Sequence, residues 1–552
     1  MSDPRGVGNG NELGEGTTYS QSIDGQASIA YVNSFDKHNV DVLVLGEVRD
    51  YISNAHSAYA KKLPFASLPE LSNGTPADNP ISGWSGQSRS AGFVFRARYN
   101  YAEKYLAEFT GRYDGSYKFA GMANTRWGFF PSGSIGWVMS KEDWMKDVTT
   151  ITNLKLRASV GLLGADNASA FSYLSTYSQW KNVILANGST QSINPAYYAS
   201  GVPNPNLTWE KNLSYNIGFD LDLWRGMLAF EVDGFYNHTF DMLTYQGSNF
   251  SPSMGGYYPS IVNKNAIDTK GIDVLVSHRH SVNAGSKPLI YGISASVTYA
   301  KSRWLIYPDS PNDPEGWKLT GKPVGSFLAW IADGLYKSEE EIDNSAWFGT
   351  RPCVGDIKYR DLNGDGTIDY YDKTLVGRPN RPQVTYGLNF DIAWNGIDFN
   401  CQFTGGALFD VSLTGTYYNG NDDNTVWTQT FKEGANSPLF LVQNAYSIYN
   451  TEGTFPRLTL GATGHGGDNG LASTFWLRDG RYLRLKTCQL GYTLPSKLTQ
   501  QAKIEAIRFF VEGQNLFTLS GLPQGIDPES PGVNNGYYPQ QRLLMGGLTL
   551  TF

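Results

Sequence analysis

The feature that most limits how this chain can fold is a strict alternation of apolar and polar residues. Between residues 212 and 223, every second residue is apolar, and the residues between them are polar or glycine. Because successive side chains of a β-strand point to opposite faces, this segment would form a strand with one apolar and one polar face. The same period of two recurs in residues 104–113, 291–299, 384–394 and 544–552. We therefore predict an all-β protein.

Two kinds of β-protein contain strands with one apolar face. In a soluble sandwich or propeller that face lies in a dry core, whereas in a membrane barrel it meets lipid and the polar face lines a wet lumen. The alternating segments are about 9–12 residues long, which suits a tilted membrane strand better than a soluble strand of about 5–6 residues. Aromatic residues also gather near strand ends, as in the interfacial girdles of barrels: Trp137, Trp224, Tyr291, Tyr299 and Trp394.

The lengths of the connections favour the membrane barrel. Short turns such as Arg225-Gly226 and Asn395-Gly396 alternate with long loops such as 301–383 and 406–478. Barrels of outer membranes alternate in this way, because their periplasmic turns are short and their extracellular loops are long. The strands are predicted at 26–34, 39–50, 88–101, 104–114, 132–139, 152–162, 212–223, 227–238, 269–279, 289–300, 384–394, 397–405, 479–493, 506–516 and 543–552.

One of these strands departs from the alternation. In residues 479–493, the apolar residues of the first half fall on one phase and those of the second half on the other. A β-bulge inserts one extra residue into a strand and would restore the facing. We therefore expect a bulge near Thr487 to Gln489.

Composition excludes several other classes of protein. The 552 residues carry 44 Lys and Arg against 51 Asp and Glu, a net charge of −7, so the basic excess of a nucleic-acid-binding protein is absent. No segment approaches the roughly 18 consecutive apolar residues of a membrane helix. Residues 1–25 are rich in Gly, Asn and Ser and do not resemble a signal peptide. We expect them to be disordered or loop-like, and residues 26–552 to form the barrel.

Several motifs resemble the SusC/RagA family of TonB-dependent outer-membrane transporters. The most recognisable runs from Gly355 to Asp369 and is followed by Gly377-Arg-Pro-Asn380. Residues 112–119 and 126–137 look like the mid-barrel hairpin of that family. Four segments look like its C-terminal strands: 482–486, 489–492, 513–517 and 548–552. The resemblance covers most of the chain from about Gly92 onward.

The resemblance implies a location and an activity. Members of this family are barrels of about 22 strands with a plugged lumen. They import glycan or peptide fragments across the Gram-negative outer membrane of Bacteroidetes-like bacteria, with a SusD-like surface lipoprotein as a lid. Their energy comes from the TonB complex, which acts through a plug domain. About fifteen of about 22 strands are predicted here, so we expect the chain to be the C-terminal part of a longer transporter.

One loop has the spacing of a calcium site. Oxygen-bearing residues from Asp361 to Asp372 follow the pattern of a twelve-residue calcium loop, with Gly366 at its sharp turn. A solvated Asp/Asn/Gly turn is the alternative. If Ca²⁺ binds, it would be a weakly held structural ion in an extracellular loop. The candidate ligands are Asp361, Asn363, Asp365, Thr367, Asp369 and Asp372.

We find no spacing that predicts catalysis, so the chain is not expected to be an enzyme. His278 and His280 could share a metal, although a polar rim is the simpler interpretation because no third ligand is near. Substrate residues stay unassigned. Candidates by loop position alone are Tyr257, Tyr258, Trp330, Trp347, Tyr417, Tyr418 and Trp427.

The main alternative to the transporter is a different class of protein. A secreted, calcium-stabilised all-β protein that binds or cleaves glycans would also contain alternating strands and an Asp-rich loop. A non-functional fragment of a transporter is a third possibility. The orientation of the apolar face separates the first two, because a secreted protein would bury that face in its core.

Overall fold

A computed structural model gives the fold of the chain. It describes residues 11–552 apart from 64–66, 68, 121–124, 188, 189, 200, 201, 246–252, 254–257, 260, 286, 414–438, 459–466 and 531–539. The chain divides into two compact units. Unit 1 comprises residues 1–135, 159–213 and 241–263, and unit 2 comprises 136–158, 214–240 and 264–552. Among the described residues, no helix is long and apolar enough to span a membrane.

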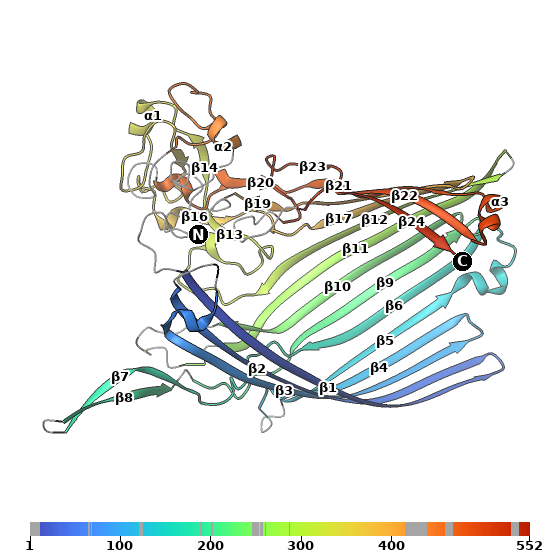
Figure 1. Ribbon diagram of the computed structural model, residues 1–552, viewed down its shortest axis with the longest axis horizontal. Coiled ribbons are helices and arrows are strands. Elements are labelled where there is room, and N and C mark those ends of the chain that lie inside the picture. The colour runs from blue at the N-terminus through green and yellow to red at the C-terminus, as the bar shows by residue number, and fades with distance from the viewer. Residues whose placement is uncertain are drawn as a thin grey trace. The chain divides into compact units, whose positions relative to one another are not determined.

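One large antiparallel sheet dominates the structure (Figure 1), and its strands follow one another in chain order. Each of the fifteen predicted strands is confirmed. Strand β23 (Thr518–Ser520) adds a short extra pairing with β21. The main strands are β1 (Asn11–Phe35), β2 (His38–Leu63), β3 (Thr75–Tyr101), β4 (Tyr105–Ser116), β5 (Trp127–Val138), β6 (Ile151–Ala165), β9 (Glu210–Leu223), β10 (Leu228–Tyr245), β11 (Ile261–Ala284), β12 (Lys287–Ile306), β17 (Val384–Trp394), β18 (Ile397–Ala407), β21 (Tyr482–Thr493), β22 (Ala506–Gln514) and β24 (Leu543–Thr551).

The prediction for the N-terminal segment is wrong over residues 11–25. These residues form the first part of β1, which pairs with β2 from Asn11↔Leu63 to Phe35↔His38. Residues 1–10 lie outside the described residues. The segment lacks apolar alternation, and its strand is instead supported by backbone pairing with β2 along almost its whole length.

The predicted bulge is present, but its position differs by one residue. Gln402 of β18 pairs with Thr487 of β21, and the next residue, Phe403, pairs with Leu485. Lys486 is therefore the extra residue, directly before the predicted segment 487–489. Because Lys486 has no partner on β18, every later side chain of β21 points to the opposite face from the one that strict alternation would give it. This explains the change of phase in the sequence.

Tight turns close the hairpins where the sequence predicts them. Trp394 pairs with Ile397, and the two residues between them, Asn395 and Gly396, have φ angles of 50° and 86°. Two consecutive positive φ angles define a type I′ turn, whose twist matches that of the strands. The other connections of this set are 36–37, 102–104, 139–150, 224–227, 285–286 and 494–505. Each is shorter than the connections before and after it, except 139–150, which is longer than the preceding connection 117–126.

The longer connections contain small elements of their own. In unit 1, β7 (Tyr177–Asn187) and β8 (Thr190–Ala199) form a hairpin that stands apart from β1–β3 (Figure 1). In unit 2, α1 and α2 gather at one end of the strands, and α3 lies at the other. The elements of unit 2 are β13 (Phe327–Trp330) paired with β16 (Lys373–Val376), β14 (Ala332–Leu335) with β15 (Ile357–Tyr359), β19 (Asp410–Ser412) with β20 (Leu477–Asp479), α1 (Glu339–Asp343), α2 (Leu439–Asn444) and α3 (Ser496–Thr499).

Three long connections of unit 2 fold together around one hydrophobic core. We call the described parts of residues 307–383, 408–481 and 515–542 the loop cluster. Its core includes Trp476, Leu441 and Phe409, which are almost fully buried. Since burial of large apolar side chains is the main source of folding stability, the loop cluster is a folded structure in its own right.

We predict that Gly396→Ala destabilises the protein more than Gly226→Ala does. Both glycines have positive φ, at 86° and 80°, so alanine is strained at either turn by about 1–2 kcal/mol. A Cβ at residue 396 would also lie 2.7 Å from the carbonyl oxygen of Thr493, whereas residue 226 has open space. Thermal unfolding in detergent measures the difference. Equal unfolding temperatures for the two variants would contradict the turn geometry.

Candidate functional site

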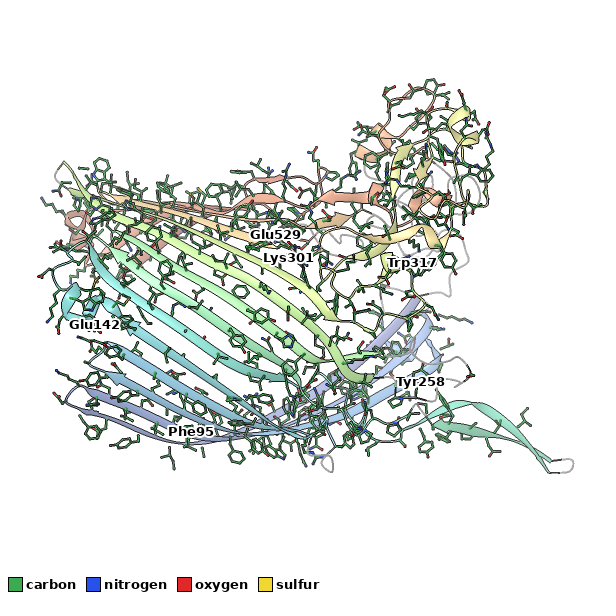
Figure 2. All side chains as sticks on the ribbon, turned by 180° about the vertical axis from the view of Figure 1, so that it is seen from behind. Phe95, Glu142, Tyr258, Lys301, Trp317 and Glu529 are labelled. Carbon is green, nitrogen blue, oxygen red and sulfur yellow. The ribbon has the colours of Figure 1, made fainter. Side chains whose placement is uncertain are left out.

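The apolar face of the sheet is exposed in unit 1. Phe93 and Tyr113 pair across β3 and β4, and their side chains are 58% and 45% exposed. Phe95, on the same face, is labelled in Figure 2. Rings of this size are normally buried in a soluble protein, and a continuous exposed stripe of them marks a surface that is covered by something else.

Unit 2 shows the same exposure on its own strands. Leu388 of β17 and Leu548 of β24 lie on the predicted apolar face, and the register of β22 with β24 places Val511 on the same face as Leu548. Each of the three is exposed. The face is therefore not the sealed core of a sandwich. Apolar side chains that are exposed on the alternating phase of several strands fit contact with lipid.

The opposite face of the sheet holds ion pairs that span several strands. In unit 2, the guanidinium of Arg157 on β6 donates to both carboxylate oxygens of Asp233 on β10, each at 2.7 Å, and to Asp220 on β9 at 3.1 Å. Gly218 lies beside this pair, where any Cβ would overlap the Asp233 carboxylate. A glycine is needed here because the charged groups approach the backbone closely.

A second network repeats this design on β18, β21 and β22. Arg508 of β22 donates to Asp398 of β18 and, at 2.6 Å, to the amide oxygen of Gln489 on β21. Gly491 of β21 lies between the partners and leaves room for both. Paired charges on one face and exposed apolar residues on the other indicate that the two faces meet different solvents.

Unit 1 has a related cluster on β2 and β4. The guanidinium of Arg112 donates to Glu47 at 2.7 Å and to Asp114 at 2.9 Å. None of these three networks was predicted from the sequence. The signal that could have found them is the position of Arg112, Arg157 and Arg508 on the polar phase of alternating strands.

The loop cluster is tied together by buried polar contacts. Asp356, which is 3% exposed, accepts hydrogen bonds from Arg457 at 2.6 Å, from the Asn469 side chain at 2.9 Å and from the Cys353 amide at 2.8 Å. Arg457 and Asn469 lie about a hundred residues after Asp356 in the chain, so no sequence spacing predicts these two contacts. A fully satisfied buried network of this kind rigidifies the structure around it.

A second buried contact anchors the C-terminal loop to the sheet. Arg484 of β21 donates to Asp527 at 2.6 Å and to Glu529 at 2.8 Å, and both Arg484 and Asp527 are buried. Burial raises the pKa of Asp527, but the amides of Glu529 and Gln540 and the Arg484 guanidinium lower it further. The net effect is a lowered pKa, so the ionised carboxylate helps to hold the loop in place.

The predicted calcium loop is a compact turn. Gly364 and Gly366 have positive φ, and their amides donate to the two carboxylate oxygens of Asp361 at 2.6 and 2.9 Å. Asp372 is fully buried and accepts from the amides of Leu362 and Asp369, each at 2.8 Å. Asp372 thus joins the two ends of the loop through the amides of Leu362 and Asp369.

The other candidate ligands of this loop are nearer to solvent. Asp365 accepts from the amide and hydroxyl of Thr367, at 2.9 and 2.7 Å, and Asn363 donates to Asp365 at 2.9 Å. Asp369 accepts from the Tyr371 amide at 2.7 Å. Within the described ranges, no group of three His, Cys, Asp or Glu side chains is arranged to hold a metal. The calcium site therefore stays a prediction.

The remaining candidates have structural partners or fall outside the described residues. Trp330 is 8% exposed, and its indole donates to the Asp369 carbonyl at 2.8 Å, so it packs inside the loop cluster. His278 lies 3.2 Å from the Tyr291 hydroxyl, as expected of a polar rim. Tyr257, Tyr417, Tyr418 and Trp427 lie outside the described residues.

Comparison with known proteins decides the family. A family described as "TonB dependent receptor-like, beta-barrel" matches residues 3–516. The chain belongs to this receptor family. TonB-dependent receptors are outer-membrane transport proteins, so the predicted outer-membrane location and the expectation that the chain is not an enzyme are confirmed.

Individual relatives agree with the resemblance to SusC and RagA. The chain is 27% identical to TonB-dependent receptor P3 of Formosa agariphila, over 95% of this chain and 52% of that protein. It is 26% identical to TonB-dependent receptor SusC of Bacteroides thetaiotaomicron, over 98% and 51%. A structure of the RagAB peptide transporter superposes with a TM-score of 0.74 at 21% identity, over 98% and 56%. The chain spans about half the length of the curated relatives it matches.

We predict that the loop anchored by Arg484 and Asp527 opens in acid. The pKa of Asp527 is lower in the folded than in the unfolded protein, where it is about 3.9. The stabilisation is therefore complete above about pH 4 and is lost as the pH falls through the folded value. Hydrogen-exchange protection of residues 521–530 should drop over this range. Asp527→Asn should lower the protection at neutral pH and flatten its pH dependence.

The control for this experiment is Glu340→Gln on α1, which removes one exposed charge elsewhere in the loop cluster. It should leave the protection of residues 521–530 and its pH dependence unchanged. Protection that is insensitive to Asp527→Asn would show that the buried ion pair does not hold the loop.

Proposed function

We propose that the whole protein to which this barrel belongs imports nutrient fragments across the outer membrane, driven by the TonB complex. The observation that carries the proposal is the division of the sheet into an exposed apolar face and an ion-paired polar face. Lipid on one side and an aqueous lumen on the other account for both. The chemistry required is passage through the barrel, and the described polar clusters are ion pairs rather than catalytic arrangements.

The substrate class is a glycan or peptide fragment. SusC is a TonB-dependent receptor, and the RagAB structures are described as those of a peptide transporter. Both kinds of substrate carry many hydrogen-bonding groups, which suits passage along a wall lined by carboxylates, guanidiniums and carboxamides such as Asp220, Arg157 and Gln489. The polar face of the barrel is therefore suited to the passage of both glycan and peptide fragments.

A SusD-like lipoprotein is the proposed partner at the outer surface. A lid that opens and closes needs a surface that keeps its shape while the lid moves. The loop cluster has its own hydrophobic core and the buried Asp356–Arg457 contact, which make it such a surface. A plug domain would couple the barrel to the TonB complex.

The proposal is tested by uptake in cells. A strain that lacks the gene should lose uptake of one class of labelled fragment, either oligosaccharides or peptides, and the restored gene should recover it. A protonophore should abolish the same uptake, because the TonB complex uses the proton gradient of the inner membrane. Uptake of both classes that is unchanged by loss of the gene would contradict the proposal.

We also propose a structural calcium ion in the loop 361–372. In support, Asp361, Asn363 and Asp365 belong to one turn formed around Gly364 and Gly366. The proposed donor set also includes the Thr367 carbonyl and Asp369. These hard oxygen donors are the kind that Ca²⁺ prefers. Asp372 keeps its contacts with backbone amides and closes the loop around the ion.

The calcium proposal predicts weak binding with a dissociation constant of about 10⁻⁴–10⁻³ M, measured by calorimetry. Asp365→Asn should weaken binding at least tenfold without unfolding the loop. Asp372→Asn should destabilise the loop with or without calcium, because it loses a buried acceptor. No measurable binding at millimolar calcium would contradict the proposal.

A further inference from the structure

Two lysines face each other directly across β11 and β12. The register of these strands pairs Lys270 with Lys301. Like charges directly opposite on neighbouring strands repel each other and destabilise a sheet. A pair in this position therefore calls for an explanation, and Lys301 is labelled in Figure 2.

The two lysines lie on the apolar face of the sheet. The preceding pair in the register, Thr269 with Ser302, is joined by a hydroxyl–hydroxyl hydrogen bond of 2.7 Å on the other face. The next pair on the lysine side is Ile272 with Tyr299, which belongs to the exposed apolar stripe. Lys270 and Lys301 thus continue the lipid-facing surface beyond its last apolar pair.

Their height relative to the membrane follows from the length of the apolar stripe. On β12 the stripe runs from Leu289 to Tyr299, ten residues apart, or about 33 Å along the strand at about 3.3 Å per residue. A strand tilted by about 40° converts this into about 25 Å of height, which is the apolar thickness of an outer-membrane barrel. The lysines therefore lie just above the hydrocarbon.

The side of the membrane is set by the connections. At the other end of β11 and β12 lies the short connection 285–286, which belongs to the periplasmic set. The lysines lie toward the long connections, which are extracellular. The two lysines therefore lie at the height of the lipid headgroups of the outer leaflet.

The neighbouring side chains compensate the positive charge only in part, because one carboxylate, Asp268, lies near three cations. Arg303 lies two residues after Lys301 on β12, on the same face of the sheet and opposite Asp268. Asp268 is engaged by His238 at 2.7 Å and by the hydroxyl of Tyr236. Among the residues that the structure describes, Lys270, Lys301 and Arg303 form no ion pair; Lys270 instead lies 5.4 Å from the centre of the Tyr236 ring.

We propose that Lys270, Lys301 and Arg303 bind the phosphate of an outer-leaflet lipid headgroup. A phosphate between the two lysines would replace their repulsion by attraction, and Arg303 can add a bidentate contact. The acyl chains of the same molecule would cover Ile272 and Tyr299 directly below. Because the cations continue a lipid-covered stripe, a phosphorylated lipid matches the surface over its whole height, whereas a free anion would match only its upper part.

The test measures binding of monophosphoryl lipid A to the purified protein in an uncharged detergent by native mass spectrometry. Lys270→Gln combined with Lys301→Gln should weaken binding about 30-fold, which is about fivefold for each lysine near a membrane surface. Lys270→Arg combined with Lys301→Arg should retain binding. The fully dephosphorylated lipid should bind the parent protein as weakly as the phosphorylated lipid binds the double Gln variant.

The matched control removes two exposed lysines from the opposite rim, by Lys287→Gln combined with Lys497→Gln. It should leave binding unchanged. Equal weakening by the control, equal binding of the dephosphorylated lipid, or full competition by millimolar inorganic phosphate would each overturn the proposal.

Stability separates a lipid site from a structural role. In the uncharged detergent without lipid, the double Gln variant should unfold at the same temperature as the parent or at a higher one, because a like-charge pair has been removed. A lower unfolding temperature would show that the lysines stabilise the fold itself, and that result would also overturn the proposal.

Discussion

The structure depends on one constraint: a chain in lipid must pair all its backbone polar groups internally while presenting apolar side chains outward. Within a sheet of long antiparallel strands, pairing with both neighbouring strands meets the first requirement, and period-two alternation meets the second. From Phe93 and Tyr113 in unit 1 to Leu388 and Val511 in unit 2, the residues on the outer phase are exposed and apolar. The ion pairs on the opposite face of the sheet and the folded loops beyond the strand ends both follow from this arrangement.

On the inner face, charge has to be compensated locally. Arg157 and Arg508 each reach across neighbouring strands to carboxylates, and Gly218 and Gly491 leave the space that the charged groups occupy. Beyond the strand ends, water replaces lipid, and the long connections follow the ordinary rules of soluble proteins. There the loop cluster buries its apolar residues inside, around Trp476, and thus reverses the pattern of the strands below it.

The sequence could predict what depends on local pattern. The fifteen strands, the Asn395-Gly396 turn and the presence of a bulge follow from side-chain period and turn chemistry, although the bulge lies at Lys486. The strand formed by residues 11–25 could not be predicted in this way, because it depends on pairing with β2 and not on alternation of apolar and polar residues. The Asp356–Arg457 contact was equally hidden, since it joins residues about a hundred positions apart. Trp330 looked like a loop-tip candidate because its burial arises only from tertiary packing.

Two adjacent residues of β17 can test directly whether the apolar face of the sheet meets lipid and the polar face meets water. Asn389 lies on the polar face, where its side chain donates to Ser294. The single variants Leu388→Cys and Asn389→Cys are each labelled with a nitroxide and reconstituted into bilayers. Collision rates with oxygen, which concentrates in lipid, and with a water-soluble nickel complex report the solvent at each site. We predict high oxygen access at residue 388 and high nickel access at residue 389. Equal access at both residues, or the reverse order, would contradict this prediction.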